Sequence, residues 1–327
     1  MAAVVENEER LFEHYFDLSP KLRMMVIDEM EAIDRCRLTR CSKLCNEEAK
    51  ASKKYLFGLF LQFVSENRIT IKVIHGELIT RQEYNIDFIK DSNTKQKICS
   101  SATWRTLWED DLDRLTSLLR RAITEFKTIL RTYRKTIKWL YIQGPYLREN
   151  IGLMRNITYG IESLDNLEEL AVCGDVDVIK IFSKLRKPLK FLNLDAVKNH
   201  ARIMNCKQVY EVRNHLNWFN ASVFNNDQFI KLSAKIVFIH IGKLTERDVY
   251  KFIRSWQNGS IGKVIKNYKW HLYRSTFNEQ KLLRLLRVKG DETRSIEIKH
   301  FLIPGKSALL EFSNGILKFL TDLEDDH

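Results

Sequence analysis

The 327-residue sequence contains little proline and glycine, 4 and 12 residues respectively, which excludes collagen-like and low-complexity chains. No run approaches the ~18 uncharged apolar residues of a membrane-spanning helix, because the most apolar stretch covers only residues 55–64. The N-terminus carries Glu6, Glu8 and Glu9 and no apolar segment, so we expect no secretory signal. The sequence therefore predicts neither a membrane protein nor a secreted one.

The sequence also lacks the patterns that enzymes and metal sites require. There is no G-x-S-x-G nucleophile motif, and no set of acid, base and nucleophile can be named. Cys36, Cys41 and Cys45 form no C-x-x-C pair and have no histidine at matching spacing, so zinc is not predicted. We predict no catalytic residue, no cofactor and no metal. The six cysteines predict reduced thiols and a cytoplasmic or nuclear location.

What the sequence does have is a basic but otherwise ordinary globular composition. The net charge is +12, with 44% hydrophobic and 29% charged residues, and the length suggests about two domains. Much of the charge falls on a helix predicted over residues 107–138, where eight Lys and Arg oppose two acidic residues between 112 and 138. The aromatic side chains lie on the apolar stripe of this helix, which favours a solvated outer face over a nucleic-acid site.

The chain opens with short predicted helices over residues 11–56. Pro20 suits a first helical turn that Asp17 or Ser19 can cap, and Ser42 can start a further helix. Helices this short have little stability alone, so they must pack on each other or on a partner. Apolar and alternating segments follow, and they predict a small antiparallel β unit over residues 55–64, 68–74 and 84–89.

A weak repeat begins near residue 137. Four segments share the pattern apolar-x-x-apolar-x-apolar, and they start at Ile137, Leu167, Leu189 and Ile236. Their central positions are 30, 22 and 47 residues apart, and the last interval is near twice 23. A period of about 23 residues is typical of leucine-rich repeats. Helical return segments are predicted at 176–185 and 246–256. Thr245 and Asp248 form a near capping box at the start of the second one.

The order of these elements resembles a known family at both ends. Residues 16–43, with FDLSPKL, VIDEM and IDRCRLTRCSK in that order, resemble an F-box. Three later runs are similar to the type 2 F-box-associated domain of nematode F-box proteins, namely FNASVFNNDQF at 219–229, KIVFI at 235–239 and LTERDVYKFIRSWQNGS at 244–260. A related nematode family, in which an F-box precedes an FTH-type tail, is the runner-up.

The resemblance implies a binding face for a Skp-type adaptor. The residues that would contact the adaptor, or hold the helices that do, are Leu18, Pro20, Leu22, Val26, Ile27, Met30, Ile33 and Leu38. We expect about half of them to be core residues, because an amphipathic helix pair buries one side internally. The block of residues 11–56 is rich in methionine and cysteine, and methionine suits adaptable interfaces. Phe252 and Trp256, within the later motif, are expected to be structural.

The expected fold is α+β or α/β, with a short helical F-box before an irregular leucine-rich-repeat-like β-α domain. The expected domains are an F-box-like block (11–56), a linking region with a β-hairpin and the basic helix (57–136), a repeat-like domain (137–303, its F-box-associated part about 208–275) and a C-terminal tail (304–327). The resemblance implies a non-catalytic substrate receptor of an SCF cullin-type ubiquitin ligase. Its partners would be a Skp-type adaptor, through it a cullin, and an unidentified protein substrate. The alternative is a repeat-type scaffold or a nucleic-acid-binding protein that uses the basic surface.

Overall fold

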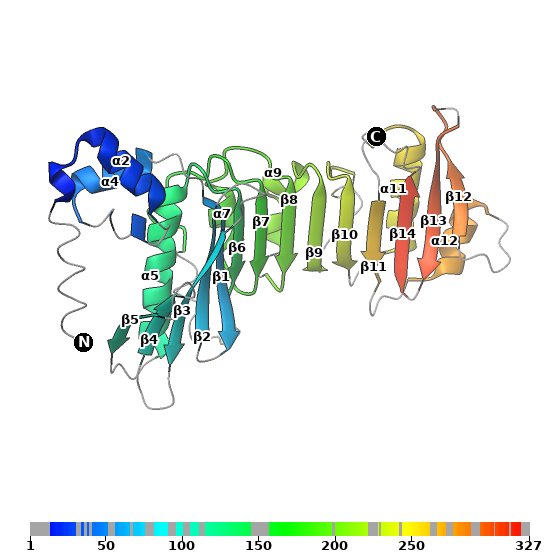
Figure 1. Cartoon of the computed structure of the whole chain (residues 1–327). Helices are drawn as coiled ribbons and strands as arrows, with labels where there is room; N and C mark the ends of the chain where they lie inside the picture. Colours follow the sequence, from blue (N-terminus) through cyan, green and yellow to red (C-terminus); the bar gives the residue numbers. More distant parts are fainter. Residues whose placement is uncertain are drawn as a thin grey trace. The chain divides into compact units, whose positions relative to one another are not determined.

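The computed structural model shows a mixed α/β chain that divides into two compact units (Figure 1). The first unit comprises Met1–Lys138 with Tyr159–Asn166, and the second comprises Trp139–Thr158 with Leu167–His327. The structure describes residues 14–30, 34–35, 38, 41–51, 56–65, 68–75, 82–90, 96–100, 105–110, 115–144, 157–197, 200–221, 228, 230–241, 244–261, 267–272, 277–288, 295–303, 305–313 and 315–321. Among the helices within these ranges, none combines the length and apolar character needed to cross a bilayer.

Short helices form the start of the first unit, here called the helical block (residues 14–51). They are η1 (Tyr15–Asp17), α2 (Pro20–Glu29) and α4 (Lys43–Ala51), and Asp34, Arg35 and Leu38 are also helical. Pro20 is the first residue of α2, and the Ser19 Oγ accepts a hydrogen bond from the Leu22 N–H at 3.4 Å. The Ser42 Oγ accepts one from the Cys45 N–H at 3.1 Å. The predicted Ser19 cap and Ser42 start are thus confirmed. Cys36 lies outside the described residues.

The rest of the first unit is an antiparallel sheet with one long helix against it. The strands are β1 (Leu56–Ser65), β2 (Arg68–His75), β3 (Gln82–Lys90), β4 (Gln96–Ser100) and β5 (Arg105–Asp110), paired in that order. Helix α5 (Leu115–Tyr133) contacts β1, β2 and β3 and buries Leu119, Phe126 and Leu130. The predicted helix start at residue 107 is wrong, because residues 105–110 bond to β4 instead of forming helical hydrogen bonds.

Parallel strands in chain order begin the second unit. They are β6 (Trp139–Gln143), β7 (Glu169–Cys173), β8 (Phe191–Asp195), β9 (His215–Ala221), β10 (Ile236–Ile241) and β11 (Asn267–His271). Helices of the second unit are α7 (Val178–Phe182), α8 (His200–Met204), α9 (Lys207–Tyr210), α11 (Glu246–Gln257) and α12 (Glu279–Leu286). They lie over one face of the strands (Figure 1). Burial alternates along these strands, so every second side chain belongs to the core.

The register of the parallel strands differs from the predicted repeat at its fourth segment. Leu192 pairs with Leu216, and Leu216 pairs with Val237, so Val237 is the equivalent of the central leucines. The repeat pattern predicts Ile239 at this central position, two residues further on. Sequence reasoning does not detect a shift of two residues, because the orientation of strand side chains repeats every two residues. The long interval of 47 residues contains an additional strand, β9.

Three antiparallel strands complete the strands of the second unit. They are β12 (Ser295–Lys299), β13 (Ser307–Ser313) and β14 (Ile316–Thr321), and the order at this end is β11-β14-β13-β12. The expectation of a C-terminal tail over 304–327 is therefore wrong. Alternating apolar residues bury Leu310 and Phe312 in β13 and Leu317 and Phe319 in β14, and Gly315 has a φ of +72° at the turn between them.

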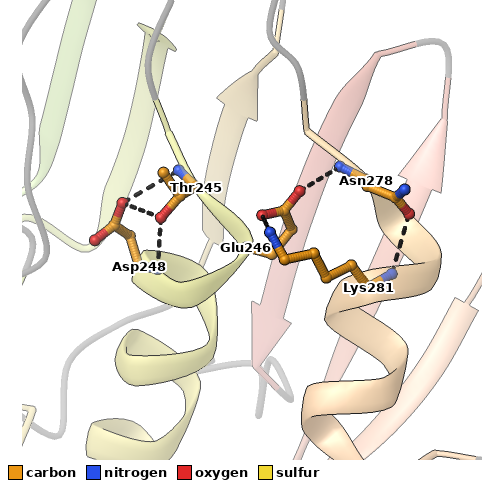
Figure 2. A network of polar contacts seen from close by, with 5 residues as sticks. All are labelled: Thr245, Glu246, Asp248, Asn278 and Lys281. Carbon is orange, nitrogen blue, oxygen red and sulfur yellow. Dashed lines mark hydrogen bonds and ion pairs between the residues drawn. The ribbon is translucent and has the colours of Figure 1, made fainter.

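Helix α11 is fixed at both its start and its buried side. The Thr245 Oγ1 accepts from the Asp248 N–H while the Asp248 carboxylate accepts from the Thr245 N–H, which confirms the predicted capping box (Figure 2). Phe252 and Trp256 are almost completely buried, as predicted for structural residues. The Phe252 ring lies 5.2 Å from the Tyr268 ring and 5.5 Å from the Phe319 ring, so it joins the parallel strands to the antiparallel ones.

Candidate functional site

The first candidate site is an apolar stripe on α2, made of Leu22, Met25 and Val26. These residues follow helical spacing and lie on one face, with exposed fractions of 48%, 56% and 41%. Phe16 and Leu44 of the same block are also exposed. Single exposed apolar residues are ordinary, whereas neighbours on one helix face mark an interaction surface.

The described residues of the helical block form a core on the other side of α2. Tyr15, Ile27, Leu38 and Cys45 are buried together, with Met24 and Met30 packed against them. The two faces of α2 therefore differ in burial, because Ile27 points inward while Leu22 and Val26 point outward. The exposed residues of the stripe do not belong to the core that the described part of the block forms.

An ion pair fixes α2 against α4. The Arg23 Nε donates to the Glu48 Oε1 at 2.8 Å, and the Arg23 Nη1 donates to the Leu18 carbonyl at 2.7 Å. The Tyr15 hydroxyl donates to the Glu48 Oε2 at 2.8 Å. Burial raises the pKa of Tyr15 far above its ordinary range, and the hydrogen bond to Glu48 adds to this effect. The stripe thus stands on a helix whose position is set by buried polar contacts.

The structure distributes the eight predicted adaptor residues between core and surface. Ile27 and Leu38 are core residues, Leu18 and Met30 are half-buried, Pro20, Leu22 and Val26 are exposed, and Ile33 lies outside the described residues. Sequence reasoning missed two exposed apolar residues, Phe16 and Leu44. Helical spacing separates Leu44 from Cys45 and Ala49, which are buried.

The second candidate site lies on the strands of the second unit. It is the face of these strands opposite their helices, here called the open face. One row across it comprises Asn193, Asn217, Phe238, Lys269 and Lys318, which pair strand by strand. All the members of this row on β8 to β11 are half-buried. Side chains that remain partly accessible on a sheet with one covered face are available to a ligand.

Aromatic rings and histidines gather at the next row of the open face. The His240 and His271 rings are stacked in parallel with centroids 4.4 Å apart. Phe219 lies 4.8 Å from His240 and 5.7 Å from Phe238. Burial and the neighbouring His271 lower the pKa of His240, against the opposing effect of Asp195. His240 is therefore neutral at neutral pH.

The charges of the open face are unevenly compensated. Lys318 forms an ion pair with Glu311 at 3.1 Å, whereas Lys269 has no ion pair within the described part of the chain. Burial and the Lys269 charge lower the pKa of His215. Burial and the Asp195 charge raise the pKa of Cys173 to about 11, so this thiol is not a nucleophile at neutral pH.

A third surface, here called the α5 surface, combines Lys127 and Arg131 of α5 with Tyr159 from a later segment of the chain. The Tyr159 ring is 73% exposed and lies 5.6 Å from the Lys127 Nζ. The Arg131 Nη2 donates to the Tyr159 carbonyl at 3.3 Å. Sequence reasoning missed this arrangement, because Tyr159 follows the helix by more than twenty residues and no local pattern places it there.

Comparison with known proteins gives no relative for this chain: no family model matches it, and no curated protein matches it in sequence. Among the residues that the structure describes, no three His, Cys, Asp or Glu side chains are grouped as a metal site would require. The candidate sites are consequently defined by their own geometry.

Proposed function

We propose that the chain is a non-catalytic substrate receptor of an SCF cullin-type ubiquitin ligase. In this proposal the helical block is an F-box that binds a Skp-type adaptor. The second unit, with its parallel strands and return segments similar in plan to leucine-rich repeats, binds the target protein. The receptor holds the target near a ubiquitin-loaded enzyme, and the resulting effective concentration accounts for the rate of transfer.

The α2 stripe is the observation that carries this proposal. Leu22, Met25 and Val26 are exposed on a helix whose other side is packed in the core of the helical block. Leu22 and Val26 belong to the residues that the F-box resemblance assigns to adaptor contact. Burying three such side chains against a partner is favourable by about 1–2 kcal/mol each, since each is already partly covered.

Adaptor binding by the full-length chain tests the proposal. We expect co-purification with a Skp-type adaptor at micromolar concentration or tighter, and loss of binding in the double variant Leu22→Asp with Val26→Asp. Lys21→Asp is the matched control, because it changes the net charge by the same amount on the same helix without removing apolar surface. Circular dichroism must show that both variants remain folded. Wild-type protein that does not bind, or a double variant that binds equally well, contradicts the proposal.

The α5 surface supports a second candidate function, binding of single-stranded nucleic acid. Exposed aromatic rings beside cations are the arrangement on which bases stack, and Tyr159 lies beside Lys127 and Arg131. Titration of a labelled oligouridylate over a range of salt concentrations tests this function. Binding that falls steeply with salt and weakens in Tyr159→Ala supports it, while binding unaffected by Tyr159→Ala contradicts it.

A further inference from the structure

Six residues on the open face form one patch across strands β9, β10 and β11. Asn217, Phe238 and Lys269 make one row, and Phe219, His240 and His271 make the next. This set, here called the open-face patch, contains a lysine and two histidines but no carboxylate. Acidic groups on the same face include Asp195 of β8, whose charge acts on His240, and Glu311 of β13, which pairs with Lys318.

The cation of the patch has no internal counter-ion. Lys269 pairs across strands with Lys318, whose charge is compensated by Glu311 at 3.1 Å, but Lys269 itself has no such partner in the described part of the chain. Two like charges on directly opposite residues repel each other. A carboxylate brought by a ligand to Lys269 relieves this repulsion.

Two polar atoms of the patch are buried and unpaired. The Asn217 Oδ1 and the His271 Nδ1 are shielded from solvent and have no hydrogen-bond partner in the described part of the chain. An amide oxygen accepts hydrogen bonds and therefore needs a donor. Polypeptide backbone N–H groups provide donors, whereas the phosphodiester groups of nucleic acids provide only acceptors.

The apolar part of the patch lies between these polar groups. The Phe219 and Phe238 rings lie 5.7 Å apart, and Phe238 is 5.2 Å from the His240 ring. Aromatic rings contribute large contact area to interfaces at little cost in conformational entropy. A ligand that complements the patch therefore combines negative charge, backbone donors and at least one apolar side chain.

We propose that the open-face patch binds an extended acidic polypeptide segment that crosses strands β9 to β11. A carboxylate of the segment accepts from Lys269, a backbone N–H donates to the Asn217 Oδ1, and an apolar side chain packs on Phe238 and Phe219. The proposal rests on the proposed function, because it specifies the chemistry of the target protein. It concerns only the second unit, so it can be tested without the adaptor.

The test is selection from a phage-displayed library of random decapeptides, panned on the full-length chain. We expect Asp and Glu to be enriched at least about five-fold over Lys and Arg around a Leu, Ile or Phe. A selected peptide, labelled with fluorescein, should bind Lys269→Gln about ten-fold more weakly than the wild type. The matched control Lys318→Gln should change binding by less than about two-fold, since that charge is already paired.

Other outcomes overturn the proposal. Selection of basic or uncharged peptides, or no selection at all, excludes an acidic segment. Equal effects of Lys269→Gln and Lys318→Gln would show that only the general charge of the face matters. Binding of oligothymidylate or inorganic phosphate that is abolished by Lys269→Gln, with no peptide selected, would assign the patch to phosphate instead. Thermal unfolding confirms that each variant is folded.

Adaptor binding by the Lys269→Gln variant separates this proposal from the proposed function. The α2 stripe and the open-face patch belong to different units, so the variant should retain full adaptor binding. If the chain binds the adaptor but selects no acidic peptide, the result supports the receptor function and contradicts the proposed ligand of the open-face patch. If the chain selects acidic peptides but does not bind the adaptor, the result supports the proposed ligand of the open-face patch and contradicts the receptor function.

Discussion

At the scale of single residues, Glu48 joins two helices of the helical block. Its two carboxylate oxygens accept from Arg23 and from Tyr15, and the Arg23 and Glu48 side chains are both nearly buried. We predict that Glu48→Gln destabilises the chain by about 2 kcal/mol, because hydrogen bonds to a buried charged group are lost. Urea unfolding measures the change. Glu47→Gln, at an exposed neighbour, should shift stability by no more than about 0.5 kcal/mol, and equal effects of the two would contradict the prediction.

Gly160 is a residue at which backbone and side-chain constraints coincide. Its φ is +79°, and an added Cβ would collide with the Arg131 guanidinium that bonds to the preceding carbonyl. Gly315 has a similar φ of +72° but open space around it. We predict that Gly315→Ala costs about 1 kcal/mol through backbone strain alone, and that Gly160→Ala costs more. Thermal unfolding of both variants checks the order, and a smaller loss for Gly160→Ala would show that Arg131 moves away freely.

Local chemistry is the part of this molecule that the sequence predicts well. Ser19 and Thr245 cap helices because a hydroxyl can reach an N–H two or three residues onward, so the sequence contains all the partners needed. Tyr159 is the contrary case. Its place beside Lys127 depends on how the chain returns to α5. Asn217 likewise gives no sign in the sequence that its Oδ1 is buried without a partner.

At the scale of elements, α11 and α12 are joined through one carboxylate (Figure 2). The Glu246 Oε1 accepts from the Asn278 N–H at 2.7 Å, and its Oε2 accepts from the Lys281 Nζ at 3.0 Å. Burial tends to raise the pKa of Glu246, but the Asn278 hydrogen bond, its own backbone and the Lys281 charge together lower it below 4.5. A carboxylate with a lowered pKa in the folded state stabilises the fold above the unfolded value, and this contribution is lost as pH falls through the folded value.

The variant Glu246→Gln tests that linkage. We predict a loss of about 2 kcal/mol at pH 7, because two charge-assisted hydrogen bonds are weakened. The difference from the wild type should shrink as the pH is lowered from about 5 to 3, where Glu246 becomes protonated. Urea unfolding over this pH series measures it, with Glu279→Gln at an exposed neighbouring position as the control. A difference that does not vary with pH would mean that Glu246 acts through packing alone.

Sequence reasoning identifies elements more reliably than it identifies their pairing. Segments around Leu140, Leu170 and Leu192 were predicted as equivalent, and they pair in that register. The fourth was displaced by two residues, because Ile239 and Val237 both have the inward parity of the strand. The paired strands β13 and β14 were missed, since short alternating segments at the end of a chain give little signal until a neighbouring strand is present.

At the scale of the whole molecule, half-buried histidines link folding to pH. The pKa values of His200, His215 and His240 all lie below 6.5, chiefly because burial disfavours the charged ring. In the unfolded chain these histidines titrate near 6.5, so below that pH the unfolded state binds more protons than the folded one. Acidification from pH 7.5 to 5.5 therefore weakens the fold. The urea midpoint should fall across this range.

Binding of an acidic segment to the open-face patch should have the opposite dependence on pH. His240 faces His271 and Asp195, and a ligand carboxylate placed beside the His240 ring favours its charged form. Peptide carboxylates remain ionised at pH 5.5, so proton uptake by His240 strengthens binding as the pH falls. We predict that calorimetric titration with a selected peptide gives about three- to ten-fold tighter binding at pH 5.5 than at pH 7.5, and that His240→Gln reduces this gain. Affinity that declines in parallel with stability would mean that the histidines serve only the fold, and that Lys269 alone attracts the ligand.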